Sequence, residues 1–94
     1  MVKRLIVSRK AYLDIDRIVE FNNLRNGSDA YSRKFLKALF IEFDLLKKFP
    51  FLGIETGREN TFLLIWDDFY IYYAIVEKHI EIKAIYHQKE NVLR

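Results

Sequence analysis

The stretch TFLLIWDDFYIYYAIVEKHIEIKAIY, from Thr61 to Tyr86, predicts three β-strands in close succession. Residues that favour strands, mainly β-branched and aromatic, fall into three runs there: Thr61–Trp66, Phe69–Val76 and Ile80–Tyr86. Asp67-Asp68 separates the first two runs, and Glu77-Lys78 with His79 separates the last two. Because connections this short join neighbouring strands that run in opposite directions, we expect an antiparallel meander.

Two helices and one further strand are predicted upstream of the meander. Val2–Ser8 is short, apolar and β-branched, and its last residue, a serine, is of a type that caps the start of a helix. Apolar residues then recur at helical spacing over about Arg9–Leu24 and again over about Asp29–Phe49. Asn26-Gly27 ends the first helix, and Pro50 ends the second because it lacks a backbone N–H.

The predicted order is therefore β-α-α-β-β-β in a single domain of residues 1–94. We expect an α+β fold in which a helical hairpin packs on one face of a small, mainly antiparallel four-stranded sheet, with the first strand at the sheet edge. Strict alternation along the last strand turns one set of side chains toward the helices: Ile80, Ile82, Ala84 and Tyr86. It turns the other set toward the open face: Glu81, Lys83 and His87, with Ile85 among them.

The composition argues against several kinds of site and location. The 94 residues include no cysteine and two histidines, so disulfides and thiolate metal sites are excluded, and we expect no metal and no cofactor. Apolar runs are far shorter than the ~20 residues of a membrane span. The N-terminal MVKRLIVSRK is too short and too charged for a signal peptide, so we expect a soluble, cytoplasmic protein without membrane contact. The net charge of +3 permits a nucleic-acid or acidic partner without requiring one.

Three segments in this order carry a family resemblance: AYLDIDRIVEF, FLKALFIEFDLLKKFPFLG and FYIYYAIVEKHIEIKAIYHQK. They resemble the two helices and the final hairpin of the RelE/ParE superfamily of bacterial toxins, over nearly the whole chain. The resemblance implies a toxin that a cognate antitoxin protein neutralises in a heteromeric complex. RelE-like members cut messenger RNA in the ribosomal A site without a metal ion. ParE-like members inhibit DNA gyrase and cut nothing themselves.

Metal-free RNA cleavage needs a general base, a general acid and cations that stabilise the charged phosphorane. RelE-like toxins place such groups on the open sheet face, and this chain departs from their pattern. Thr61 and Phe62 stand where many members have an arginine, Tyr70 stands at a second such place, and Glu90 stands at a third. The candidates left for catalysis are few: His87, Lys89 and Arg58. This reduced set argues against an enzyme, and any activity it supports would be that of a metal-independent endoribonuclease.

Two further groups of residues are candidates for binding. On the predicted open face, Lys83, Tyr70 and Tyr72 are suited to stacking and phosphate contacts with a nucleic acid, or to cover by an antitoxin segment, and both readings stay open. The second helix carries a second apolar stripe of Leu36, Phe40 and Phe43. That stripe fits either packing between the two helices or a groove for an antitoxin helix or a second copy of the chain.

Three functions remain in order of preference. The first is a ParE-like toxin that inhibits growth by binding its target, with DNA gyrase as the implied candidate. The second is a RelE-like, ribosome-dependent mRNA endoribonuclease, and the third is an α+β interaction module without toxic activity. The first two share the fold and the antitoxin partner, and they differ in whether a phosphodiester is cut.

Overall fold

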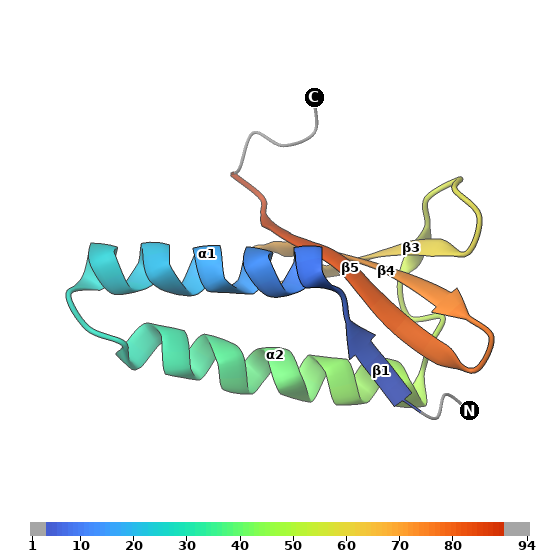
Figure 1. The fold of residues 1–94 in the computed structure, drawn as a ribbon, viewed down its shortest axis with the longest axis horizontal. Coiled ribbons are helices and arrows are strands. Elements are labelled where there is room, and N and C mark those ends of the chain that lie inside the picture. Colours follow the sequence, from blue (N-terminus) through green and yellow to red (C-terminus); the bar gives the residue numbers. More distant parts are fainter. Residues whose placement is uncertain (1–3, 90–94) are drawn as a thin grey trace.

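Two helices lie on one face of a five-stranded sheet (Figure 1). The computed structural model describes residues 4–89. Within that range the elements follow in the order β1 (Arg4–Val7), α1 (Arg9–Asn26), α2 (Ala30–Lys48), β2 (Ile54–Glu55), β3 (Thr61–Trp66), β4 (Phe69–Val76) and β5 (His79–His87). The strands lie in the order β1-β5-β4-β3-β2, with β1 parallel to β5 and the other neighbours antiparallel. The predicted α+β class, helical hairpin and meander are confirmed.

The sheet has one strand more than the four that were predicted. Ile54–Glu55 forms β2 and pairs antiparallel with β3, with Ile54 opposite Leu63 and Glu55 opposite Phe62. A run of two residues is too short to show the alternation that identifies a strand, so the segment after Pro50 looked like a plain connector. This short strand makes the edge of the sheet next to β3.

Local chemistry sets both ends of α1. The Ser8 hydroxyl accepts a hydrogen bond from the backbone N–H of Ala11 at 3.1 Å, as the sequence predicts for a cap. At the other end Gly27 has a φ of 67°, a left-handed conformation that glycine adopts without strain, and its N–H donates to the carbonyl of Asn23. The turn between α1 and α2 lies away from the sheet, so the tip of the hairpin projects beyond it (Figure 1).

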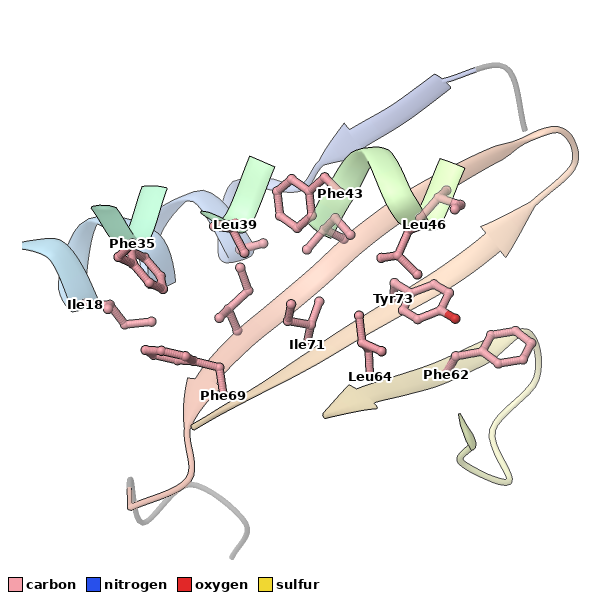
Figure 2. Packing of buried hydrophobic residues seen from close by; sticks show 14 residues of the cluster. Ile18, Phe35, Leu39, Phe43, Leu46, Phe62, Leu64, Phe69, Ile71 and Tyr73 are labelled. Atoms are coloured by element: carbon pink, nitrogen blue, oxygen red, sulfur yellow. The ribbon is translucent and has the colours of Figure 1, made fainter. Parts of the chain in front are cut away.

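The hydrophobic core fills the space between the helices and the inner face of the sheet. Figure 2 shows Phe35 of α2 next to Phe69 of β4 at one end of this core, and Leu46 next to Tyr73 at the other. The rings of Phe35 and Phe69 lie 4.9 Å apart, and Phe69 and Tyr73 are almost fully buried. Within residues 4–89 neither helix is long and apolar enough to cross a membrane.

Tyr73 ties this core to the connector before β2. Its hydroxyl donates a hydrogen bond to the carbonyl of Pro50 at 2.8 Å and accepts one from the backbone N–H of Gly53 at 2.9 Å. A Cβ atom on Gly53 would lie 2.8 Å from the Tyr73 hydroxyl and 2.9 Å from the carbonyl oxygen of Leu63. Position 53, where the connector passes close to the Tyr73 side chain, therefore requires glycine.

A β-bulge changes which residues of β5 face the helices. Tyr73 pairs with Ile82 and Tyr72 pairs with Ala84, so Lys83 is an extra residue without a partner in β4. Beyond the bulge, each residue of β5 faces the side opposite to the one that simple alternation would give it. Ile85, paired with Ile71, is therefore fully buried in the core. The bulge therefore reverses the alternation predicted for the end of this strand.

Four residues consequently lie on faces opposite to those predicted: Ala84, Ile85, Tyr86 and His87. Tyr86 pairs with Tyr70 and Ala84 pairs with Tyr72, both on the open face, whereas His87 pairs with Phe69 on the side of the helices. The prediction that His87 lies on the open face is wrong, because one inserted residue shifts the two-residue period of a strand by half. The positions before the bulge, Ile80 and Ile82, face the core as predicted.

Candidate functional site

The last residue of β5, His87, lies beside the core and not on the open face. Its ring meets the ring of Phe69 edge-on, with centroids 5.3 Å apart and planes at 89°. Its Nδ1 accepts a hydrogen bond from the backbone N–H of Lys89 at 3.1 Å. The predicted grouping of His87 with Lys89 is thus present, but it is held by a turn of the backbone at the end of the strand.

A hollow opens at this end of the sheet, between the second half of α1, the start of α2 and the end of β5. We call it the His87 hollow, and the residues in its wall that matter below are Arg17, Phe21, Arg25, Tyr31, His87 and Lys89. It measures about 710 Å³. Asp68, in the turn between β3 and β4, also lines it. Three cationic side chains and one carboxylate therefore share its wall.

The side chain of Asp14 fixes the position of α1 against the end of β5. This carboxylate is only 2% exposed, and it accepts the backbone N–H of Ile85 at 3.0 Å. Lys10 donates to its two oxygens at 2.7 and 2.8 Å, and Arg17 donates to it at 2.7 Å. Arg17 also donates to the carbonyl of Ile85 at 3.3 Å. Beyond the end of β1, side chains of α1 thus form the hydrogen bonds to the edge of β5 that a neighbouring strand would otherwise form.

Three tyrosines lie together on the open face of the sheet. Tyr70, Tyr72 and Tyr86 belong to neighbouring positions of β4 and β5, and the rings of Tyr72 and Tyr86 are 6.1 Å apart. The Nζ of Lys10 lies 4.5 Å from the centre of the Tyr86 ring. Burial lowers the pKa of Lys10, but its hydrogen bonds to Asp14 and Tyr86 and its attraction to both outweigh this, and the pKa is raised. Lys83, at the bulge, is exposed.

The third predicted catalytic residue, Arg58, lies at the opposite end of the sheet. Its carbonyl accepts a hydrogen bond from the backbone N–H of Thr61, which begins β3 and pairs with Ala74. His87 pairs with Phe69, five residues from Ala74 along β4. At the rise of a strand this is a separation of roughly 17 Å along the sheet. The structure brings His87 and Lys89 together and does not bring Arg58 to them.

The predicted stripe on α2 divides between the core and the surface. Phe43 is 4% exposed and belongs to the core, and Leu36 is partly buried against it. Phe40 is 55% exposed, with its ring 6.2 Å from that of Phe43. Of the three, Phe40 alone presents most of its side chain to a partner, and Phe43 is explained by packing inside the chain.

Sequence reasoning missed four residues that the structure places near the predicted ones: Lys10, Arg17, Arg25 and Tyr86. The spacing of Lys10, Asp14 and Arg17 on one helix face was a signal for a charged cluster, because residues three and four apart are neighbours on a helix. No such signal existed for their contact with β5. Glu90, which the sequence suggested as a negative charge beside Lys89, lies outside the described residues.

No group of three histidine, aspartate or glutamate side chains within residues 4–89 is arranged to hold a metal ion. Around the His87 hollow and on the open face, the described residues offer cations, tyrosine hydroxyls, the imidazole of His87 and the carboxylate of Asp68. These groups can bind anions and flat rings.

Both the sequence and the fold of this chain are similar to those of known proteins. The family model described as the ParE toxin of the type II toxin–antitoxin system parDE matches residues 5–92. A solved structure entitled "Chromosomal ParDE TA system from P. aeruginosa" shares the fold, with a TM-score of 0.77 and 19% sequence identity over 93% of this chain and 96% of that one. Curated protein sequences give no significant match. The match over nearly the whole chain confirms the resemblance, and the chain belongs to the ParE toxin family of type II toxin–antitoxin systems.

Proposed function

We propose that this toxin arrests growth by binding its target, without cutting nucleic acid, and that a cognate antitoxin protein neutralises it. DNA gyrase is the candidate target. The observation that carries this proposal is the separation of Arg58 from His87 and Lys89, which lie at opposite ends of the sheet. The candidate catalytic groups do not surround one place at which a phosphodiester would sit.

The chemistry of the reaction explains why this separation matters. Attack by a 2′-hydroxyl on the adjacent phosphate needs a base, an acid and cations within hydrogen-bonding reach of the same phosphate. A separation of roughly 17 Å along the sheet is several times the length of such a contact. With the connector before β3 in this conformation, Arg58 therefore cannot stabilise charge on a phosphate that His87 contacts.

The open face of the sheet supports a binding function. Three residues lie side by side across this face: Ile54 of β2 is opposite Leu63 of β3, and Leu63 is opposite Tyr72 of β4. A neighbouring row contains Ile65, which is 52% exposed, and Tyr70. An exposed apolar and aromatic surface of this kind suits a protein partner. Tyr70, Tyr72 and Lys83 are the residues that we propose for target binding.

The helical hairpin supplies a second surface. Phe40 is 55% and Ile41 is 62% exposed on α2, and we propose that this side of the hairpin contacts the antitoxin. A second copy of the chain would compete for the same apolar surface, so the mass of the toxin with and without antitoxin separates these two partners. A 1:1 or 2:2 complex in which Phe40 is protected from solvent is the expected result.

Induced expression in the absence of antitoxin tests the proposed mechanism. SOS induction and filamentation with intact messenger RNA are expected if the toxin inhibits gyrase. Rapid loss of translation, with cleavage at ribosome-bound codons, would show that the chain is an endoribonuclease instead. Normal growth with folded protein in the cell would show an interaction module without toxic activity. Supercoiling by purified gyrase, with and without the toxin, gives the corresponding measurement in vitro.

A RelE-like endoribonuclease is the second candidate, and the His87 hollow is the observation that favours it. There an imidazole, Lys89 and two arginines meet without Arg58. The variant that combines His87→Ala and Lys89→Ala abolishes toxicity under this second mechanism and leaves antitoxin binding intact. Full toxicity of that double variant would exclude the nuclease assignment.

A further inference from the structure

We propose that the toxin forms a two-fold symmetric dimer through an apolar patch at the C-terminal end of α2. We call it the α2 patch, and it consists of five exposed side chains on the helix and on the connector that follows: Ile41, Leu45, Phe49, Phe51 and Leu52. Of these, only Ile41 is shared with the surface proposed for the antitoxin. The proposal concerns the toxin alone, so its outcome does not depend on the target or on the antitoxin.

The side chains of the α2 patch follow one another along the helix and the turn after it. Ile41, Leu45 and Phe49 are four residues apart, and this spacing places them on one stripe of a helix. At Phe49 the chain turns sharply, because the backbone N–H of Leu52 donates to its carbonyl at 3.1 Å. The ring of Phe51 then meets that of Phe62 in β3 edge-on, with centroids 5.8 Å apart. The turn therefore extends the stripe toward the sheet.

The exposed apolar area of the α2 patch is sufficient for a specific contact. Phe51 is 74%, Ile41 is 62% and Phe49 is 57% exposed. At such fractions the five side chains offer on the order of 500 Å², which is within the range of the largest patch on a typical monomer. Two copies would bury roughly 1,000 Å² before any polar rim is added, which is the lower limit for a biological interface. A reversible dimer is the expected result.

The charges at the two ends of the α2 patch are opposite. Lys37 is exposed and lies one helical turn before the stripe. Glu55 is exposed in β2 and lies opposite Phe62, the residue that Phe51 contacts, so it borders the other end. Neither Lys37 nor Glu55 forms an ion pair with a described residue. Both charges are therefore available to a partner.

A second copy of the chain is the partner whose charges match. A two-fold axis through the α2 patch reverses the direction of the helix, so the Lys37 end of one copy meets the Glu55 end of the other, and does so twice. The two apolar stripes meet between these pairs. An acidic protein segment or an anionic membrane surface would satisfy Lys37 but would place negative charge against Glu55. Only a partner with both charges in reversed order satisfies the two ends at once.

Sedimentation velocity of the purified toxin measures self-association directly. The mass is expected to rise from one chain at about 1 μM to two chains at about 200 μM, as for a Kd in the micromolar range, and no further. Over the same range the NMR signals of Ile41, Phe49 and Leu52 should shift. The signal of Leu24, which is 81% exposed on α1, should not. One chain at every concentration, or growth beyond two chains, overturns the proposal.

A pair of apolar substitutions tests which surface is used. Combining Ile41→Asp with Leu52→Asp should weaken dimerisation at least about tenfold, because charge would be buried between the copies. Combining Leu13→Asp with Leu24→Asp makes the same change at exposed positions of α1 and should leave dimerisation intact. Far-UV circular dichroism verifies that both pairs are folded. Equal loss in the two pairs would mean that general apolar attraction, and not the α2 patch, holds the copies together.

An exchange of charges tests the two-fold arrangement and uses exposed positions that leave the core untouched. Lys37→Glu and Glu55→Lys should each weaken dimerisation several-fold, because each creates two like-charge contacts. Combining the two substitutions exchanges the charges and should restore dimerisation. Lys78→Glu, at an exposed position in the turn between β4 and β5, makes the same change away from the α2 patch and should have no effect. A combined variant that stays as weak as the single variants contradicts the proposal.

Discussion

The carboxylate of Asp14 accepts the backbone N–H of Ile85 at 3.0 Å, so a helix side chain occupies the position that a neighbouring strand would fill. β1 pairs with β5 only from His79 to Ile82, and the next residues of that edge have no strand beside them. Asp14 and Arg17 together bond both the N–H and the carbonyl of Ile85. This contact protects a sheet edge that would otherwise be open to pairing with another chain.

Replacing Asp14 tests that role. Asp14→Ala leaves the buried N–H of Ile85 without an acceptor and should reduce the free energy of unfolding by about 1–3 kcal/mol. Urea denaturation measures the change. Asp16→Ala, which removes an exposed carboxylate from the same helix, is the matched control and should be nearly neutral. A similar loss of stability in both variants would mean that charge on α1, and not the contact with β5, is responsible.

Removing the Tyr73 hydroxyl should release the connector before β2. Tyr73→Phe leaves the N–H of Gly53 and the carbonyl of Pro50 without this partner, at a cost of about 1–3 kcal/mol in the free energy of unfolding. Tyr72→Phe, on the open face, serves as the control with little expected loss. Hydrogen exchange of the Gly53 amide should accelerate in the first variant and stay unchanged in the second.

The same hydroxyl predicts a loss of stability in alkaline solution. Burial raises the pKa of Tyr73, and the hydrogen bond from Gly53 offsets only part of that effect. Because its folded pKa lies above its unfolded pKa, the contribution of Tyr73 is complete below about pH 10 and is lost as the pH rises through the folded value. Unfolding measured between about pH 9 and 11 should show a steeper decline for the parent chain than for Tyr73→Phe.

Replacing Glu42 should increase the stability of the protein, in contrast to the losses expected at Asp14 and Tyr73. Its partial burial raises the pKa of its carboxyl, so the ionised form is disfavoured in the folded chain. Glu42→Gln should therefore stabilise the protein at pH 7 by less than about 1 kcal/mol, and the gain should disappear once acid protonates the parent carboxyl. Thermal unfolding at pH 7 and at acid pH checks this, with the exposed Glu20→Gln as the neutral control.

Phe40 and Phe43 should respond differently to truncation although they are three residues apart. Phe43→Ala creates a cavity in the core and should cost about 3–5 kcal/mol of stability. Phe40→Ala removes a ring that is 55% exposed and should leave folding nearly intact while weakening the proposed antitoxin contact. Denaturation curves and antitoxin pull-down with the folded variants provide the two measurements. If Phe40→Ala leaves the affinity for the antitoxin unchanged, the antitoxin binds to another surface of the toxin.

Much of the fold could be predicted because its signals are local. The runs of strand-forming residues between Thr61 and Tyr86, the Ser8 cap and the Gly27 stop each depend on a few adjacent residues. β2 could not be predicted, because two residues show no period. The bulge at Lys83 could not be predicted either, because a local run of alternating residues does not reveal where its partner strand omits one.

The candidate site was predicted less completely for the same physical reason. His87 and Lys89 are neighbours in the sequence, and their association follows from that. Arg17, Arg25 and Tyr31 reach the same hollow from helices about 55 to 70 residues earlier, as the packing of α1 along β5 requires. Arg58 was grouped with His87 from sequence alone, and the lengths of β3 and β4 keep them apart.

The amino-acid sequence by itself determined the order of elements, the hydrophobic faces of the two helices, the antiparallel meander and the family to which the chain belongs. Those properties depend on local propensity and periodic burial, which a linear pattern records. Only the tertiary structure decided that His87 faces the helices and that Tyr86 lies on the open face. That outcome depends on the pairing of β4 with β5, where one unmatched residue reverses every side chain that follows it.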